Sequence, residues 1–317
     1  MADKALFTLA PIVSFVPALL TFAVIPFASP LPTRWGVVPM VVADLPVGFL
    51  YILAISSLGV YGIVLAGWSS NNKYALLGGL RASAQMISYE IALGMSTVAV
   101  LLLAGNVTLS QVVAQQQRSL WFVLPLTIAF LIFFISAFAE TNRLPFDLPE
   151  AEGELIAGYH TEYSAMKFSM FYIAEYSNMV TASALMATLF FGGWDIPFTT
   201  WDSAGEPTVL KTIVTLLAFG AKTFFFIFTY IWVRWTLPRF RYDQLMALGW
   251  KVLLPLALLY VAVLAVAIWF VRVQIGWAYG PGMALVLFGL NVALLVPLVW
   301  WLDRGRLVSG SMPLETT

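Results

Sequence analysis

Long runs of apolar residues, each of about 20 positions, alternate with short polar segments along the chain. A helix needs about 20 consecutive, mostly apolar residues to cross the hydrocarbon core of a bilayer, so each run predicts one transmembrane helix. Prolines inside several runs fit this interpretation, because neighbouring groups in a membrane protein satisfy the carbonyls that proline frees. The eight runs cover residues 5–27, 47–67, 87–104, 120–139, 168–191, 209–233, 252–271 and 282–302.

This pattern predicts an all-α, polytopic membrane protein with about eight transmembrane helices. No internal repeat, low-complexity tract or soluble domain interrupts the runs, so residues 1–317 are expected to form a single integral membrane domain. The first run is longer than the core of a signal peptide, which has roughly 7–15 residues, and is expected to remain as a span.

The composition agrees with lipid as the main solvent and limits the cofactors that this chain can bind. Of the 317 residues, 61% are hydrophobic and 10% are charged, against about 25% charged in an ordinary soluble domain. The formal net charge of zero argues against a nucleic-acid partner. With no cysteine and a single histidine, His160, the chain cannot bind an iron–sulfur cluster, a Cys/His zinc ion or a bis-histidine haem by itself. No metal site is expected, and electrons for any redox reaction must arrive on a partner.

The basic residues predict the orientation in the membrane. Eight spans put both ends of the chain on one side, and the side with more Lys and Arg is expected to be cytoplasmic. That side collects Lys4, Lys73, Arg81, Arg143, Lys167, Arg234, Arg239, Arg241, Lys251, Arg304 and Arg306. The opposite side has Arg34, Arg118, Lys211 and Arg272. Both termini are therefore expected in the cytoplasm.

An acidic segment, ETNRLPFDLPEAEGEL at residues 140–155, follows the fourth run. It contains five of the sixteen acidic residues of the chain, namely Glu140, Asp147, Glu150, Glu152 and Glu154. Prolines favour a loop over residues 143–148, and Asp147 with Glu150 has the spacing of a helix capping box. Capping accounts for these two acids and partly for Glu152. It leaves Glu154, one turn beyond Glu150, and Glu140, at the end of a span, without a structural role.

Further charges lie inside the spans: Glu90 in the third, Glu175 in the fifth and Lys222 in the sixth. A charge at the bilayer centre costs roughly 2.5–3.5 kcal/mol, so Glu175 and Lys222 are expected in the protein interior with polar partners. Glu90 is shallower, and a snorkelling or capping role remains an alternative for it. Together with Glu140 these residues predict a buried polar chamber that opens to the cytoplasm. Crowding and burial raise the proton affinity of carboxylates, so such a cluster can exchange protons near neutral pH.

Three cytoplasmic stretches are expected to line the mouth of this chamber: GWSSNNKY at residues 67–74, the acidic segment with its continuation AGYHTEYS, and RWTLPRFRYDQLMALGWK at residues 234–251. The first supplies Trp68, Lys73 and Tyr74, with Arg81 following. Arginines of the third stretch complement the acidic segment in charge, although positive-inside topology and contact with lipid headgroups explain them equally well. His160 is interpreted as a hydrogen-bonded histidine at the membrane interface.

These stretches resemble the signature loops of the family of H-type subunits of NADH–quinone oxidoreductase, which form the quinone chamber in the membrane arm of respiratory complex I. The resemblance runs from residue 2 to the last span. It implies a proton-translocating NADH:quinone oxidoreductase of the bacterial inner membrane, active only as an assembly, with ubiquinone or menaquinone as substrate. NADH, FMN and the iron–sulfur clusters would be carried by partners, which include peripheral-arm and small membrane-arm subunits beside membrane lipid. The acidic path carried over from the family consists of Glu90, Glu140, Arg143, Glu150, Glu152, Glu154, Glu162 and Glu175, and the matching basic loop contains Arg239 and Arg241.

One departure from the family pattern concerns the start. Family members usually begin with a further span and a basic amphipathic segment that helps to form the quinone entrance, whereas this sequence starts at the second family span. A start codon placed too far downstream, a truncation, or a segment encoded elsewhere would each explain the difference.

Two other interpretations remain open. A homologous membrane component of an energy-converting hydrogenase has a similar fold without a quinone. A stand-alone proton-coupled transporter belongs to a different class, but the paired repeats with interrupted helices that are common in transporters are not evident here.

Overall fold

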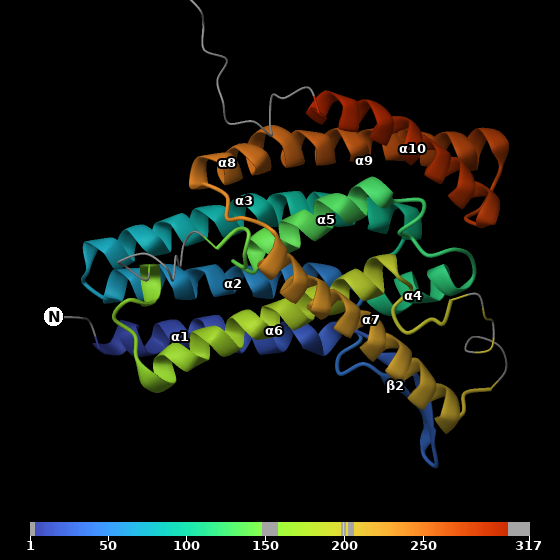
Figure 1. Cartoon of the computed structure of the whole chain (residues 1–317). Helices are drawn as coiled ribbons and strands as arrows, with labels where there is room; N and C mark the ends of the chain where they lie inside the picture. The colour runs from blue at the N-terminus through green and yellow to red at the C-terminus, as the bar shows by residue number, and fades with distance from the viewer. Residues whose placement is uncertain (1–3, 148–157, 198, 200, 202–205, 304–317) are drawn as a thin grey trace, which may run out of the picture.

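The computed structural model describes residues 4–147, 158–197, 199, 201 and 206–303. Most of its long helices run side by side, and α7 crosses them obliquely (Figure 1). The α-helices are α1 (Lys4–Leu20), α2 (Gly48–Ser69), α3 (Lys73–Ala104), α4 (Leu109–Gln117), α5 (Thr127–Glu140), α6 (Ala165–Phe190), α7 (Val209–Thr236), α8 (Tyr242–Ala247), α9 (Leu254–Trp269) and α10 (Pro281–Asp303). Shorter helical turns are η1 (Thr21–Val24), η2 (Gly158–His160), η3 (Leu248–Leu253) and η4 (Phe270–Ile275), and the two strands are β1 (Ala28–Thr33) and β2 (Gly36–Met40).

The predicted all-α, polytopic architecture is confirmed. Among the described residues six helices, and not the predicted eight, are long and apolar enough to cross a membrane: Lys4–Val24, Gly48–Ser69, Lys73–Ala104, Val209–Thr236, Tyr242–Ile275 and Pro281–Trp300. The fourth and fifth predicted spans correspond to α5 and α6, which do not meet both criteria. The α6 helix has the length but carries more polar residues, whereas α5 has only 14 residues and a length of about 21 Å.

The short α5 has a specific cause in Asn291, a fully buried residue of α10. Its Nδ2 donates to the carbonyl of Pro125 at 2.7 Å, and its Oδ1 accepts a hydrogen bond from the backbone N–H of Ile128 at 3.3 Å. The Tyr260 hydroxyl also donates to this oxygen at 3.1 Å. Non-helical backbone at membrane depth is tolerated where protein groups satisfy its hydrogen bonds. The Asn291 amide supplies hydrogen bonds that the missing first turns of the predicted span would have made.

Two elements were not predicted from the sequence. A hairpin of β1 and β2 follows the first span and lies against α7, where the Thr215 hydroxyl accepts a hydrogen bond from the N–H of Ser29 at 3.1 Å. The short helix α4 lies between α3 and α5 and contacts the last turn of α6. Its Gln116 is fully buried and accepts hydrogen bonds from the N–H groups of Phe122 and Gly192.

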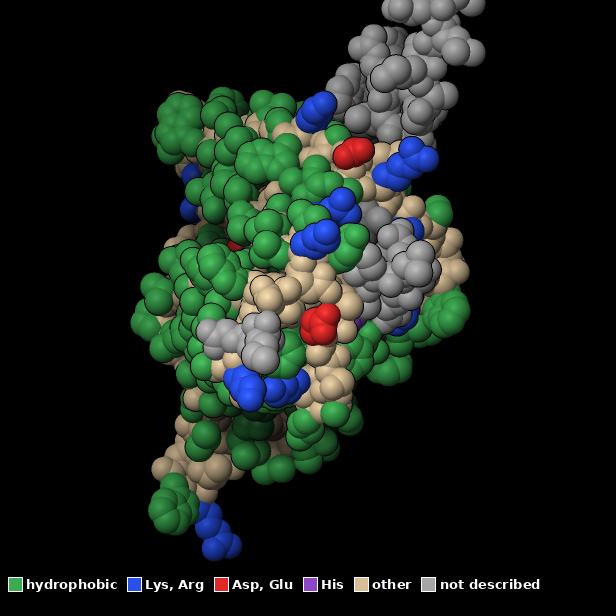
Figure 2. Space-filling view, turned by 90° about the vertical axis from the view of Figure 1, so that its left-hand side faces the viewer, with side chains coloured by type: hydrophobic (Ala, Val, Ile, Leu, Met, Phe, Trp, Pro, Cys, Tyr) green, Lys and Arg blue, Asp and Glu red, His purple; other side chains and the backbone are tan. Residues whose placement is uncertain are grey.

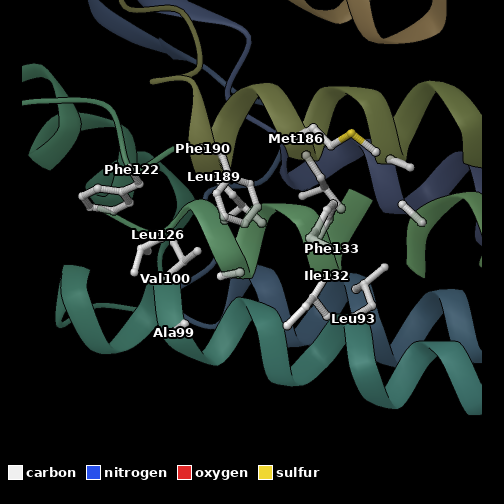
Figure 3. Packing of buried hydrophobic residues seen from close by; sticks show 14 of the residues in the cluster. Leu93, Ala99, Val100, Phe122, Leu126, Ile132, Phe133, Met186, Leu189 and Phe190 are labelled. Carbon is white, nitrogen blue, oxygen red and sulfur yellow. The ribbon is translucent and has the colours of Figure 1, made fainter. Parts of the chain in front are cut away.

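The main core lies where α3, α5 and α6 meet. Figure 3 shows Leu93 from α3, Ile132 and Phe133 from α5, and Met186 and Phe190 from α6 packed against one another. In Figure 1, α9 and α10 lie above α3 and α5, while α1, α2 and α6 lie below. This packing holds the end of α5, and hence Glu140, against α3 and α6.

The contact between α1 and α2 depends on Gly62, and we predict that Gly62→Ala lowers stability. A Cβ at this position would lie 2.8 Å from the backbone nitrogen of Ser14 and 2.9 Å from the carbonyl oxygen of Ala10, so the helices must separate at a cost of about 1–3 kcal/mol. Gly59→Ala is the matched control on the same helix, because no atom lies within 4 Å of its added Cβ. The melting temperature of the protein in its purified assembly should fall for the first variant only. Equal melting temperatures would contradict this account.

Candidate functional site

Charged residues gather at one end of the molecule, where α5 and α7 end and α3, α6 and α8 begin; we call it the charged end. Figure 2 looks onto this end and shows lysine, arginine and acidic side chains among polar groups, with hydrophobic side chains around them. Described parts of the three stretches expected at the mouth of a chamber contact one another here: Asn72 bonds Glu162, and Arg239 pairs with Asp147. Their role as the mouth of a chamber stays a prediction.

A single amide holds the beginning of the acidic segment. Gln85 of α3 is fully buried, and its Nε2 lies 2.9 Å from the carbonyl oxygen of Ala139, 3.2 Å from Oδ1 of Asn142 and 2.9 Å from the carbonyl oxygen of Phe146. This residue was not predicted from the sequence, because it precedes the predicted third span at residues 87–104 and only charged groups were singled out. The signal was present as a glutamine four residues before Tyr89 in an apolar helix.

Arg143 of the acidic segment forms an ion pair with Glu175 of α6, with 2.5 Å between Nε and Oε1. Both side chains are about nine-tenths buried, with 12% and 11% of their surface exposed. The guanidinium also lies 4.4 Å from the ring centroid of Tyr176. Glu175 is thus in the interior with a charged partner, as predicted.

The basic loop, residues 237–241, packs on the acidic segment. Arg239 pairs with Asp147 at 3.5 Å, the N–H of Phe240 donates to the carbonyl of Pro145 at 3.1 Å, and the rings of Phe240 and Phe146 stack with centroids 5.7 Å apart. The charge complementarity inferred from the sequence is therefore a direct contact for Arg239. Arg241, by contrast, is exposed at the start of α8.

Glu140, the last residue of α5, lies between two small cavities of about 40 Å³ each. Glu140, Thr141 and Asn178 line both cavities; the first also reaches Glu175 and the second reaches Ser56. A polar cavity of this size can hold a water molecule. Polar groups therefore follow one another from Glu175 past Glu140 toward α2.

Glu90 of α3 extends this series. The hydroxyl of Ser57, the neighbour of Ser56 on α2, donates a hydrogen bond to Oε1 of Glu90. Glu90 and Glu140 also interact electrostatically. We call Glu175, Glu140 and Glu90 the carboxylate series. It links α6, α5 and α3, and the half-buried Glu90 has a hydroxyl as its hydrogen-bond partner.

A groove of about 1250 Å³ opens between α2 and α3 at the charged end. Its lining residues are Phe7, Val64, Gly67, Trp68, Ser70, Asn71, Asn72, Lys73, Leu76, Leu80 and Glu162. Of the predicted mouth residues, Trp68 and Lys73 line it, whereas Tyr74 and Arg81 are exposed outside it. The Lys73 ammonium lies 5.8 Å from the ring of Tyr74, and the Arg81 guanidinium lies 5.9 Å from that of Tyr242. Glu162, at the rim, accepts a hydrogen bond from Asn72 at 3.0 Å.

Aromatic side chains separate the groove from the first cavity. The ring of Tyr163 stacks on Phe7 at 4.0 Å and meets Phe171, which lines the cavity, edge-on at 5.1 Å. Burial raises the pKa of the Tyr163 phenol, and its hydrogen bond with Ser69 acts in the opposite direction. Tyr163 therefore stays protonated and neutral between the groove and the cavity.

His160 is buried in this same cluster. Its ring lies 5.1 Å from that of Tyr159 and 5.3 Å from that of Phe168, in edge-on arrangements. From the sequence it was expected at the membrane interface as a hydrogen-bonded side chain. The structure adds that its ring packs among aromatic rings.

Lys222 has polar partners in the interior, as predicted, but the structure does not bring it to the carboxylates. Its Nζ donates to the carbonyls of Phe191 at 2.6 Å, Gly193 at 3.0 Å and Asp195 at 2.5 Å, and lies 4.2 Å from the ring centroid of Trp121. These carbonyls follow the end of α6, sixteen residues after Glu175 and thus about 24 Å along the helix. Lys222 stabilises that helix end because the last carbonyls of a helix lack intrahelical donors.

Three acids of the acidic segment, Glu150, Glu152 and Glu154, lie outside the described residues, and so does the predicted capping box of Asp147 with Glu150. Within the described part of the chain, no group of three or more His, Asp or Glu residues is placed to hold a metal ion. The site is thus a groove followed by buried acids and hydroxyls. Such an arrangement can bind an amphipathic molecule and conduct protons.

Known proteins are similar to this chain over most of its length. The family model described as NADH dehydrogenase matches residues 1–265. Three proteins named as H-type subunits of NADH-quinone oxidoreductase are similar, and the one from Geobacter metallireducens is 52% identical over 262 residues, 83% of this chain and 75% of the relative. One from Geobacter sulfurreducens is 51% identical over 270 residues, 85% of this chain and 78% of the relative. One from Cytophaga hutchinsonii is 49% identical over 258 residues, 81% of this chain and 75% of the relative. The chain therefore belongs to the NADH dehydrogenase family, as the resemblance of its loops had indicated.

Proposed function

We propose that this chain is the subunit of a proton-pumping NADH–quinone oxidoreductase that forms part of the quinone chamber and couples quinone reduction to proton movement. The observation that carries the proposal is that the groove adjoins the aromatic cluster, which in turn adjoins the cavity beside the carboxylate series. The names of the similar proteins supply the reaction. The geometry supports the assignment of roles to residues.

The groove suits a quinone. Its volume exceeds the roughly 300–1,000 Å³ of ordinary ligand pockets, and its lining joins apolar side chains such as Leu76 and Leu80 to the polar Asn72 and Lys73. A headgroup bound at the polar end would leave the isoprenoid tail along the apolar side. Trp68, Tyr74 and Arg81 then lie around the entrance.

The carboxylate series provides the coupling. Reduction of a quinone to a quinol consumes protons at both carbonyl oxygens and changes the charge of the chamber. Carboxylates that are crowded and buried respond to such a change by binding or releasing protons. In this proposal Arg143, Asp147 and Arg239 set the field at Glu175, and Glu140 and Glu90 pass the effect into the membrane. Glu150, Glu152, Glu154, Glu162 and Arg241 are assigned to the cytoplasmic opening.

The proposal also assigns the side of the membrane and the neighbours of this subunit. The charged end faces the bacterial cytoplasm, in agreement with the basic asymmetry, and contacts the peripheral-arm subunits that carry FMN and the iron–sulfur clusters. The quinone headgroup is reduced at a cluster on such a neighbour. Small membrane-arm subunits and lipid cover the remaining sides.

Filling the groove tests this assignment. Leu76→Trp is expected to raise the KM for quinone about tenfold, equivalent to 1.4 kcal/mol, because Leu76 lines the groove. Leu77→Trp is the matched control, since Leu77 is the next residue of α3, is exposed and does not line the groove. Steady-state kinetics of the purified complex with a short-chain quinone gives both values. An unchanged KM for Leu76→Trp would remove the groove from the quinone path.

A further inference from the structure

At the end of the molecule opposite the charged end, we propose a binding site for the phosphate headgroup of an anionic membrane phospholipid. A pocket of about 700 Å³ lies there between the end of α3, the helix α4 and the turn that joins η4 to α10. Among its lining residues are Gln111, Gln115, Arg118, Arg272, Trp277 and Tyr279. The proposal is independent of the quinone function, which uses the other end.

The charge of the pocket points to an anion. Only four basic residues are expected on this side of the membrane, and two of them, Arg118 and Arg272, line this one pocket. Among the described residues of the lining there is no Asp or Glu. Arginine matches the geometry of phosphate oxygens with its fork of N–H donors. Two arginines without a neutralising carboxylate in a shared pocket therefore favour a phosphate group.

The two arginines are held differently. Nη2 of Arg272 donates to the carbonyl of Leu103 at 3.1 Å, which fixes the guanidinium at the end of α3. Arg118 follows the last turn of α4 and is exposed. Attraction to the carbonyl ends of α3 and α4 accounts for one arginine at each helix. It does not account for both side chains lining the same pocket together with Gln111 and with Gln115, whose Nε2 donates to the carbonyl of Leu103 at 3.4 Å.

The surroundings identify the anion as a lipid. Exposed apolar side chains follow the pocket along the chain: Val273 and Ile275 of η4 are next to the lining residues Arg272 and Gly276, and α10, which follows the pocket, exposes Leu285 and Val286. Trp277 and Tyr279 stand at its edge, and tryptophan and tyrosine are typical of the level of the headgroups. The Tyr279 hydroxyl donates to the carbonyl of Leu120 at 2.9 Å, so this edge is held in place. A phospholipid bound here would place its phosphate between the arginines and its acyl chains along α9 and α10.

Lipid binding to the purified, delipidated complex tests the proposal. Phosphatidylglycerol added to the delipidated complex is expected to bind and to raise the melting temperature of this protein. Added zwitterionic phosphatidylcholine should give a smaller rise. In Arg118→Gln/Arg272→Gln, the affinity for phosphatidylglycerol should fall at least about tenfold. Arg34→Gln, which removes an exposed arginine on the same side but outside the pocket, should bind as the parent does.

Other outcomes would overturn the proposal. Equal retention of phosphatidylglycerol by the parent and the double variant, counted by mass spectrometry of extracted lipid, would show that the lipid binds elsewhere. Inorganic phosphate at millimolar concentration is the second arm: displacement of phosphatidylglycerol by phosphate alone would assign the pocket to a free anion. Arg118→Gln alone provides a variant that keeps the bond between Arg272 and Leu103. A loss of affinity in that single variant cannot be attributed to a disturbed end of α3.

Discussion

Glu140→Gln in the assembled complex is expected to lower NADH-driven quinone reduction and proton pumping at least about tenfold, because positioned acid–base groups typically contribute 10²-fold or more. Glu140 lies between the two cavities and interacts with Glu90. Glutamine keeps the shape and hydrogen-bonding capacity of the side chain but cannot take up or release a proton. The measurement is quinone reduction with simultaneous proton uptake in inverted membrane vesicles.

Two controls separate loss of proton transfer from loss of assembly. NADH oxidation by an artificial acceptor that bypasses the quinone should stay at the parent level in Glu140→Gln. Glu206→Gln, a change at an exposed acid far from the carboxylate series, should leave all activities unchanged. Pumping by Glu140→Gln at the parent rate would exclude Glu140 from the proton path.

Arg143→Leu is expected to destabilise the protein by about 3–5 kcal/mol, the usual effect of removing one partner of a buried ion pair. The change leaves Glu175 buried about nine-tenths without its guanidinium partner. Replacing both residues, in Arg143→Leu/Glu175→Leu, should restore most of the stability, because no unpaired charge is left inside. The double variant should nevertheless stay inactive in proton pumping, since the first member of the carboxylate series is gone.

Melting temperatures of the parent, Arg143→Leu, Glu175→Leu and the double variant measure the coupling between the two side chains in a double-mutant cycle. Arg81→Leu is a suitable control: Arg81 is exposed and lies over the ring of Tyr242, a contact that contributes about 0.5–1 kcal/mol. Additive effects of the two single changes would mean that the pair does not act as a unit. A double variant with full pumping would exclude Glu175 from the path.

Most helices and their approximate ends were predictable because lipid acts on each segment separately. The third span was predicted too short, since α3 begins at Lys73 and not near residue 87. A run of about 20 apolar residues has one low-energy state in a bilayer, whatever its neighbours are. The same reasoning predicted that Glu175 and Lys222 need interior partners, since a charge facing lipid costs several kcal/mol. The gathering of the acidic segment and the basic loop at one end follows from the alternation of the spans.

The departures from prediction arose where one segment satisfies the backbone of another. The fourth run looked like a full span, yet α5 begins only at Thr127 because Asn291, on α10, bonds the backbone on either side of the break. The structure likewise drew attention to Gln85, whose amide holds the loop after α5. A neutral polar residue in an apolar helix indicates that its side chain bonds another group, but the hydropathy pattern does not identify that group.

The sequence by itself indicated lipid as the main solvent, the end at which charge collects and the family. It predicted eight spans, whereas six helices of the described residues are long and apolar enough to cross a membrane. Tertiary structure alone decided which charges meet. Glu175 pairs with Arg143 and lines the same cavity as Glu140. Lys222 instead binds carbonyls at the other end of α6. Hydropathy is a property of each segment, and it fixes depth in the membrane only approximately. Distances between side chains depend on the packing of all the helices together, so they cannot be obtained from any one of them.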